Sequence, residues 1–234
     1  MASLQGTRVT WLGHSTVLVR TAAGTNLLID PFIAHNPKYP TDYQLPEKID
    51  YILLTHGHSD HISDAVPVAG KHASTVVAIY ELADYVAAKG VKNTIGMNLG
   101  GTVQLNDVEA TLVEAKHSSG AQDESGTHYV GVAGGFVLTI AGGPVLYHAG
   151  DTTVFSDMQL IRELYHPRLV MLPIGGHYTM GPQEAAMAVR FLAPEAVLPL
   201  HFGTFPPLAG TPDQLSALVD SSVEVIRCQP GETL

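Results

Sequence analysis

The chain has 234 residues, of which 45% are hydrophobic and 15% are charged, and its 12 Lys and Arg against 22 Asp and Glu give a net charge of −10. This composition excludes a disordered or fibrous chain, and the lack of a basic run predicts that nucleic acid is not a partner. No apolar run reaches the ~18 residues of a membrane helix, no signal peptide opens the sequence and its one cysteine, Cys228, can form no internal disulfide, so we expect no membrane partner and a cytoplasmic location.

The first elements that the sequence predicts are strands. Short β-prone runs at residues 8–12, 16–20 and 26–29 predict an antiparallel meander. Residues 32–48 contain three prolines and no clear period, so a long loop is expected there. The pattern then predicts a strand at 51–54, a helix at 62–70, a strand at 75–78 and a helix at 81–89.

The second half repeats this order. Strands are expected at 108–115, 129–133, 136–140 and 145–147, the last two joined by the Gly142-Gly143 turn. A helix at 155–165, a strand at 169–172, a helix from Pro182, a strand at 197–200 and a helix after the Thr211 capping box follow. No linker divides residues 1–234. The sequence therefore predicts one α/β (α+β) domain, a four-layer αββα sandwich with helices outside two sheets.

The densest polar pattern is His56-Gly57-His58-Ser59-Asp60-His61, which directly follows the apolar run 51–54. Imidazole nitrogens and carboxylate oxygens suit zinc, manganese and iron. His56 and His58 are one residue apart and project the same way from an extended backbone, whereas Asp60 and His61 can face a second ion after a turn. The alternative is a hydrogen-bonded polar loop, which neutral imidazoles would stabilise little.

Three further candidates, His117, Asp151 and His201, also come at or just after β-prone runs. Alone, each is ambiguous, because a loop histidine is usually only solvated and Asp151 could be a turn residue or a helix N-cap. If the strand ends share one edge of the sandwich, all of the candidate ligands converge there. The seven candidate ligands are His56, His58, Asp60, His61, His117, Asp151 and His201.

A His-x-His-x-Asp-His pattern after a hydrophobic strand is the signature of the metallo-β-lactamase superfamily, which this chain resembles along nearly its whole length. Within that superfamily it is similar to the small metal-dependent hydrolases related to the ascorbate-6-phosphate lactonases. The segments that carry this second resemblance are Gly13-His14-Ser15-Thr16, Asp30-Pro31, His148-Ala149-Gly150-Asp151-Thr152 and Thr179-Met180-Gly181-Pro182.

The resemblance implies a site for two divalent ions, with zinc expected first and manganese or iron as alternatives. It assigns His56, His58 and His117 to one ion. It assigns Asp60, His61 and His201 to the other. Asp151 matches the carboxylate that bridges both ions, which repel each other and require a shared anionic oxygen.

Three more residues are candidates around this site. The resemblance makes Asp30 an outer contact that accepts a hydrogen bond from a ligand imidazole, and the alternative is an Asp-Pro turn that ends a strand. His14, in a tight turn, and His177, in a glycine-rich loop, could bind substrate or move protons, or could be ordinary core or surface histidines. We predict catalytic roles for Asp60, as a proton acceptor, and for His177.

The function expected first is a binuclear hydrolase that uses a metal-bridging hydroxide on an ester, lactone or phosphodiester of a small metabolite. The alternative is a metal-site protein without hydrolytic turnover, such as a diiron redox module or a scaffold. A small-molecule substrate and a homo-oligomer are the expected partners. The resemblance favours a small metabolite, either neutral or anionic, and the cations near the motifs that an anionic one could contact are Arg20, Lys38, Lys116 and Arg162, none of which the sequence favours over the others.

Overall fold

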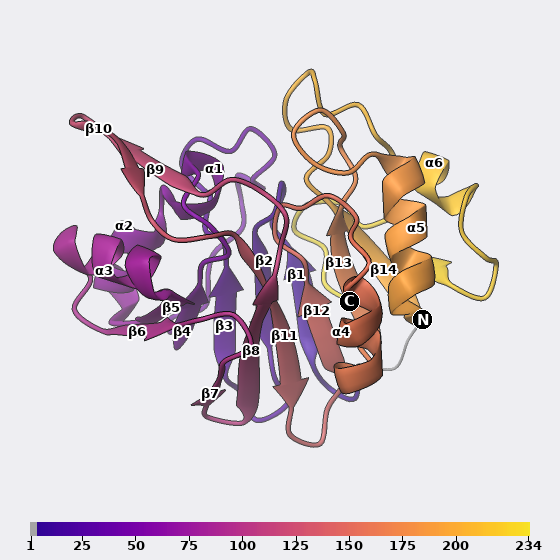
Figure 1. Ribbon diagram of the computed structural model, residues 1–234. Helices are drawn as coiled ribbons and strands as arrows, with labels where there is room; N and C mark the ends of the chain where they lie inside the picture. The colour runs from indigo at the N-terminus through magenta and orange to yellow at the C-terminus, as the bar shows by residue number, and fades with distance from the viewer. Residues whose placement is uncertain (1–3) are drawn as a thin grey trace.

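The computed structural model describes residues 4–234, which form two β-sheets packed face to face with helices on the outside (Figure 1). The first sheet has six strands in the order β1-β2-β3-β4-β5-β6. Their bounds are β1 Arg8–Trp11, β2 Val17–Arg20, β3 Asn26–Ile29, β4 Tyr51–Leu53, β5 Thr75–Ile79 and β6 Thr94–Met97.

The second sheet has seven strands in the order β15-β14-β13-β12-β11-β8-β7. Their bounds are β7 Thr102–Leu105, β8 Val108–Glu114, β11 Gly134–Ile140, β12 Val145–His148, β13 Leu169–Pro173, β14 Ala196–Leu200 and β15 Glu224–Val225. A separate hairpin of β9 (Gly120–Asp123) and β10 (Gly126–Tyr129) projects from the body of the molecule (Figure 1).

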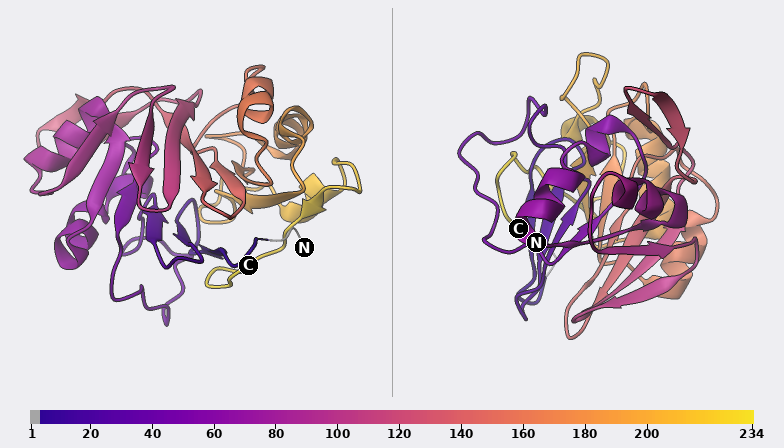
Figure 2. Two further views of the ribbon diagram at one scale, coloured as in Figure 1. Left: turned by 90° about the horizontal axis from the view of Figure 1, so that it is seen from below. Right: turned by 90° about the vertical axis from the view of Figure 1, so that its left-hand side faces the viewer.

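Helices cover the outer faces of both sheets, as Figure 2 shows from two further directions. Their bounds are α1 Ser59–Ile62, α2 Ala65–His72, α3 Tyr80–Ala88, α4 Met158–Tyr165, α5 Pro182–Leu192 and α6 Pro212–Ser216. The Thr211 hydroxyl accepts a hydrogen bond from the Gln214 N–H, so the predicted capping box does begin α6. None of the helices within residues 4–234 has the length and apolar character needed to cross a membrane.

Alternation along the central strands produces the two apolar layers. On β13, Leu169 and Met171 belong to the core between the sheets, whereas Val170 and Leu172 belong to the layer that includes α4 and α5 residues. Successive strand residues point to opposite faces, so a continuous apolar run can serve both layers. This arrangement confirms the predicted αββα sandwich.

Strand direction gathers the loops of interest at one edge. In the first sheet, β3 pairs parallel with β4, and β1 runs the same way as β3 because both are antiparallel to β2. In the second sheet, β12, β13 and β14 are parallel, and β8 runs with them because β8 and β12 are both antiparallel to β11. The segments that follow β1, β3, β4, β8, β12 and β14 therefore leave their sheets at corresponding ends.

Several local predictions were wrong. The helix expected at 62–70 is two helices, α1 and α2, and the strand expected at 129–133 is absent, because Tyr129 ends β10 and residues 130–133 are not in a strand. The strands β6, β7, β9, β10 and β15 were not predicted. The hairpin sequences Gly-Ala-Gln-Asp and Gly-Thr-His-Tyr lack alternating apolar residues, since this hairpin is largely exposed and buries little.

Candidate metal centre

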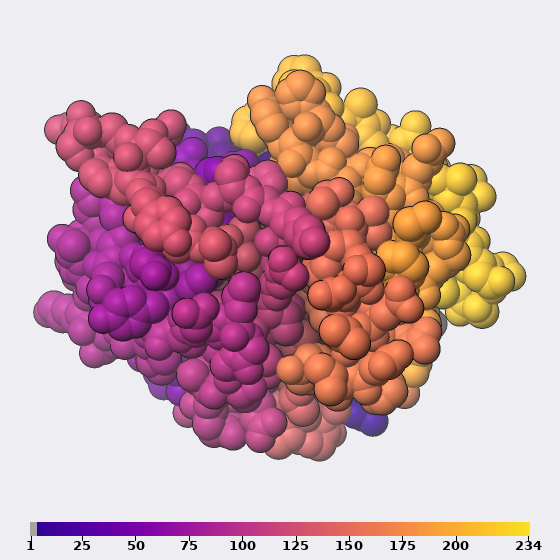
Figure 3. Space-filling view, viewed as in Figure 1, coloured from indigo at the N-terminus to yellow at the C-terminus, as the bar shows by residue number. Residues whose placement is uncertain are grey.

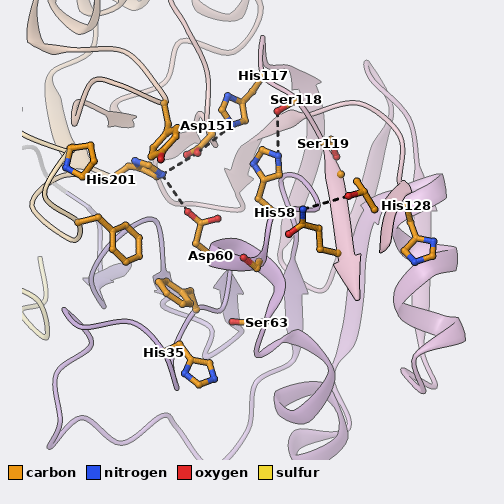
Figure 4. A pocket seen from close by; sticks show the side chains of 18 of the residues that line it. His35, His58, Asp60, Ser63, His117, Ser118, Ser119, His128, Asp151 and His201 are labelled. Carbon is orange, nitrogen blue, oxygen red and sulfur yellow. Dashed lines mark hydrogen bonds and ion pairs between the residues drawn. The ribbon is translucent and has the colours of Figure 1, made fainter. Parts of the chain in front are cut away.

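The structure brings the seven candidate ligands together at the edge where the strands end (Figure 4). His56 follows β4, His117 follows β8, Asp151 follows β12 and His201 follows β14. The short helix α1 carries Asp60 and His61. A site built from strand ends of both sheets is held by the rigid core beneath it.

The first cluster consists of His56, His58 and His117, whose ligand atoms lie within 4.8 Å of one another. His56 Nε2 lies 3.0 Å from His58 Nδ1, so the alternation expected for an extended backbone does direct both rings to one point. The intervening Gly57 is required for space, because a Cβ atom there would collide with the Val130 side chain. Because residue 57 is a glycine, the loop from His56 to His61 can pack directly against the segment that follows β10.

The second cluster consists of Asp60, His61 and His201, and His14 lies in the same 4.8 Å group. His201 Nε2 is 3.8 Å from Asp60 Oδ2, and His61 Nε2 is 3.9 Å from the same oxygen. His61 and His201 are buried, whereas the Asp60 side chain is 29% exposed and faces the cavity. This cluster therefore offers two buried imidazoles and one accessible carboxylate.

Asp151 lies between the two clusters. Its Oδ2 atom is 3.6 Å from His117 Nε2 and 4.0 Å from His56 Nε2 on one side. On the other side, the same oxygen is 3.1 Å from His201 Nε2 and 3.4 Å from His61 Nε2. One carboxylate oxygen thus faces ligand nitrogens of both clusters, which is the position required of a bridging ligand.

Asp30 supports the second cluster from below. Its Oδ2 atom accepts hydrogen bonds from His61 Nδ1 at 2.8 Å and from the Thr55 hydroxyl at 2.6 Å, and its Oδ1 atom accepts one from the Thr55 N–H at 2.8 Å. These bonds hold the His61 ring with Nε2 directed at the cluster. The contact has the geometry expected for the outer role of Asp30, and Thr55 was not identified from the sequence.

His14 contacts the second cluster through its ring. Nε2 lies 3.0 Å from Asp60 Oδ2 and Nδ1 lies 2.9 Å from the Thr204 hydroxyl. Burial lowers the pKa of His14 to about 4, although its hydrogen bond with Asp60 opposes this shift. A neutral ring satisfies both contacts, because Nε2–H donates to Asp60 and Nδ1 accepts from Thr204. Thr204 also had no recognisable signal in the sequence.

His177 lies apart from these groups. Its side chain is exposed, and its ring centroid is 4.3 Å from that of Tyr178. His177 is not among the described residues that line the cavity beside the two clusters. Tyr178, the next residue, does line the cavity. The glycine-rich loop therefore presents the tyrosine, and the proton role predicted for His177 gains no support from this position.

The charges around the second cluster indicate that the site is suited to cations. Burial lowers the pKa of His61, but the carboxylates of Asp151, Asp30 and Asp60 outweigh burial and raise it well above its ordinary value. For Asp60, burial raises the pKa, but the nearby His61 ring and the hydrogen bond from His14 lower it overall, and His201 adds to the lowering. Three carboxylates thus hold negative charge where positive charge is favoured.

Several buried nitrogen and oxygen atoms of the site have no hydrogen-bond partner. His61 Nε2, Asp151 Oδ1 and both ring nitrogens of His201 are buried without a hydrogen-bond partner. Buried polar atoms are normally paired, so several orphaned nitrogen and oxygen atoms in one place indicate a missing ligand. The donor set of imidazoles and carboxylates fits zinc, manganese or iron.

The centre lies at the floor of an open cavity of about 1260 Å³. His58 and Asp60 face it from the first sheet, and His117, Asp151 and His201 face it from the second. Ser118 and Ser119 lie near His58, on the other side of the metal ligands from His35 and Ser63 (Figure 4). A small molecule can therefore reach both clusters at once.

The chain is similar to known proteins over most of its length. The family model for the beta-lactamase superfamily domain matches residues 8–201. A UPF0173 metal-dependent hydrolase from Koribacter versatilis is 49% identical over 230 residues, which cover 98% of each chain. Igni18, a metallo hydrolase from Ignicoccus hospitalis, is 36% identical with a TM-score of 0.84 over 97% of both chains.

A more distant structure shows only that the fold is shared. CmlA, a diiron β-hydroxylase from Streptomyces venezuelae, has a TM-score of 0.68 and 17% identity, and the match covers 93% of this chain and 48% of CmlA.

Proposed function

The chain belongs to the UPF0173 family of metal-dependent hydrolases in the beta-lactamase superfamily, and on this basis we propose that it is a binuclear hydrolase of an ester, lactone or phosphodiester in a small molecule. The observation that carries the proposal is the position of Asp151, whose Oδ2 atom lies within 4.0 Å of a ligand nitrogen from each of four histidines in two clusters. A single ion of four to six ligands cannot use all seven side chains.

The first cluster would hold one ion, the second cluster would hold the other, and Asp151 would be shared. When bound, two such ions would lower the pKa of a water toward neutrality and polarise a substrate oxygen. Zinc is the first choice for this donor set, and manganese and iron are the alternatives.

The residues of the chain itself supply position and proton acceptance. Asp30 orients His61, and His14 donates a hydrogen bond to Asp60 Oδ2. Asp60 and Asp151 both line the cavity, and Asp60 is the more exposed of the two, at 29% against 3%, so it is the group placed to accept a proton from a water there. The buried Asp30, in contrast, has no access to substrate.

The alternative of a metal-site protein without turnover gains no support from a specific observation. Its likeness to a diiron hydroxylase is one of fold, and fold alone does not determine function. The relative that is 49% identical and the structure that is 36% identical are both described as hydrolases.

Elemental analysis combined with a hydrolysis screen tests this proposal. Protein purified without chelator, then loaded separately with zinc, manganese or iron, should contain two ions per chain and hydrolyse at least one of three probes. The probes are para-nitrophenyl acetate, a fluorogenic lactone and bis(para-nitrophenyl) phosphate. One ion at saturation, or no turnover of any probe with two ions bound, would refute the binuclear hydrolase.

A further inference from the structure

The cavity above the metal centre has two unlike walls. One wall carries the aromatic rings of Phe32, Phe205 and Tyr178. The other carries neutral hydrogen-bonding side chains on residues 118–129. Those residues are Ser118, Ser119, Gln122, Thr127 and Tyr129, and His128 lies among them.

The aromatic wall adjoins the second cluster. The centroids of the Phe32 and Phe205 rings lie 5.6 Å and 5.7 Å from that of His14, which contacts Asp60. The loop that carries Gly175 and Tyr178 is joined to the loop that carries Phe205 and Gly210 by a hydrogen bond, in which the Gly210 N–H donates to the Gly175 carbonyl at 3.1 Å. Phe205 is 36% exposed and Tyr178 is 59% exposed, so apolar ring surface is presented to the cavity.

The polar wall adjoins the first cluster. The Ser118 hydroxyl lies 3.3 Å from His58 Nε2, and the Ser119 hydroxyl accepts from the Gly57 N–H at 3.2 Å. The segment continues into the β9–β10 hairpin, which Figure 3 shows projecting on one side of the hollow at the top of the molecule. These hydroxyl and amide groups can bind neutral oxygen or nitrogen atoms but cannot neutralise an anion.

None of the lysines and arginines within residues 4–234 lines this cavity. Lys116 Nζ lies 5.6 Å from the Phe155 ring centroid, and Lys38 lines a different, smaller hollow beside Trp11. Arg20 ends β2, which runs opposite to the strands that lead to the site. Arg162 lies on α4. The cations expected to bind an anionic metabolite are therefore placed elsewhere.

Two further imidazoles, those of His35 and His128, line the cavity away from the centre. His128 Nε2 lies 2.8 Å from Asp123 Oδ1, and the other oxygen of Asp123 pairs with Lys89 Nζ at 2.6 Å, so the His128 ring is held in contacts within this group. His35 is exposed in the loop after β3. A remote substrate anion would thus lose water without a permanent cationic partner, in a chain whose net charge is −10.

From these two walls we infer that the substrate carries no charged group beyond its scissile ester, lactone or phosphodiester, and places an aromatic or bulky apolar group against Phe32, Phe205 and Tyr178. This inference rests on the proposed hydrolytic function. Ligand sites are typically apolar with a few placed polar groups, and both parts are present here.

A matched pair of esters tests the inference with the metal-loaded protein. The para-nitrophenyl ester of phenylpropanoic acid and the para-nitrophenyl monoester of adipic acid have the same leaving group, but the first ends in a phenyl ring and the second in a carboxylate. We expect kcat/KM to be at least about tenfold higher for the phenyl ester. Equal values of kcat/KM, or a higher value for the adipate ester, would overturn the inference. In that case, loss of adipate turnover in His35→Gln would identify His35 as the group that binds the carboxylate.

Variants test whether the preference for the phenyl ester depends on the aromatic wall. Tyr178→Ala should lower kcat/KM for the phenyl ester by about threefold to tenfold and lower that for the adipate less, so that the preference between the two esters narrows. Tyr80→Ala is the matched control, because Tyr80 is 57% exposed on α3 and does not line the cavity. Phe205→Lys should narrow or invert the preference by supplying the missing cation. An unchanged preference in both Tyr178→Ala and Phe205→Lys would contradict the assignment of this wall.

Binding of two amides, the uncharged phenylpropanamide and the anionic adipic monoamide, separates this inference from the proposed function. Ligand-observed NMR should detect phenylpropanamide on the metal-loaded protein and should detect less binding of it to Tyr178→Ala. If no ester is hydrolysed but phenylpropanamide binds in preference to adipic monoamide, the hydrolytic function fails and the assignment of the cavity stands. If adipic monoamide binds as well as phenylpropanamide, the inference fails whatever the protein hydrolyses.

Discussion

The Nε2 atom of His148 lies 3.0 Å from the backbone carbonyl oxygen of Ser15, which joins the last residue of β12 to the turn between β1 and β2. The Nδ1 atom of the same ring accepts a 3.1 Å hydrogen bond from the Gly150 N–H. Burial lowers the pKa of His148, in keeping with a neutral ring that donates at Nε2 and accepts at Nδ1. One side chain thus connects the loop of Asp151 to the turn of His14, across the two sheets.

We expect His148→Asn to weaken binding of both ions by about 10–100-fold, because outer contacts that orient ligands typically have effects of that size. The reason is that Asn is too short to reach Ser15 while it holds Gly150. Metal affinity measured by competition with a chromogenic chelator checks this. His72→Asn is the control. His72 also contacts a backbone carbonyl, that of Glu47, at 3.0 Å, but it is the last residue of α2 and is not part of the metal centre. Unchanged affinity in His148→Asn would contradict the positioning role.

Much of the site was predictable because its chemistry is local in sequence. The pattern from His56 to His61 follows a recognisable buried strand, and the loop positions of His117 and His201 follow from the ends of other strands. The contacts of Thr55, Thr204 and the two His148 partners were not predictable. These are single hydroxyl or backbone groups brought together by sheet packing, and no residue type or spacing marks them in the sequence.

The same distinction applies to the fold. Strands such as β13, which are buried on both faces, appear as continuous apolar runs and were found. The hairpin β9–β10 was missed because its strands are largely exposed and carry no apolar alternation. Asp123 on the hairpin pairs with Lys89 beyond α3 at 2.6 Å, and Tyr129 at its end is 75% exposed. An exposed strand of this kind has no periodic signal.

Asp151→Ala should reduce activity more than Asp30→Ala. The first change removes the carboxylate that faces both clusters, and the second removes the oxygen that orients His61. We expect the Asp30 variant to lose about 10–100-fold in kcat/KM and the Asp151 variant to lose more, with loss of at least one ion. Steady-state kinetics at saturating metal, with metal content measured in parallel, distinguish the two. Small and equal losses would show that Asp151 is not the bridge.

His177→Ala tests the proton role predicted from the sequence. A general acid at this position would give a loss of about 10²–10⁴-fold in kcat, whereas its exposed position outside the cavity lining predicts a change within about threefold. Both ions should stay bound. Rates for His177→Ala and Tyr178→Ala on the same substrate settle which residue of the loop acts, and a large loss of kcat in His177→Ala alone would restore the catalytic assignment.

Thr204→Val tests whether the hydrogen-bonded chain from Thr204 through His14 to Asp60 sets the geometry of the second cluster. The hydroxyl donates to His14 Nδ1, so its loss leaves a buried imidazole nitrogen unpaired and frees the ring to turn away from Asp60. We expect kcat/KM to fall by about tenfold, with weaker retention of one ion and little loss from the first cluster. Thr204→Ser keeps the hydroxyl and should restore both properties.

The pKa of about 4 for His14 means that the ring is neutral from pH 5 upward, so the loss of kcat/KM in Thr204→Val should be constant between pH 6 and 9. A loss that disappears at high pH would instead show that a charged His14 is the working form, and an equal loss in Thr204→Ser would attribute the effect to packing.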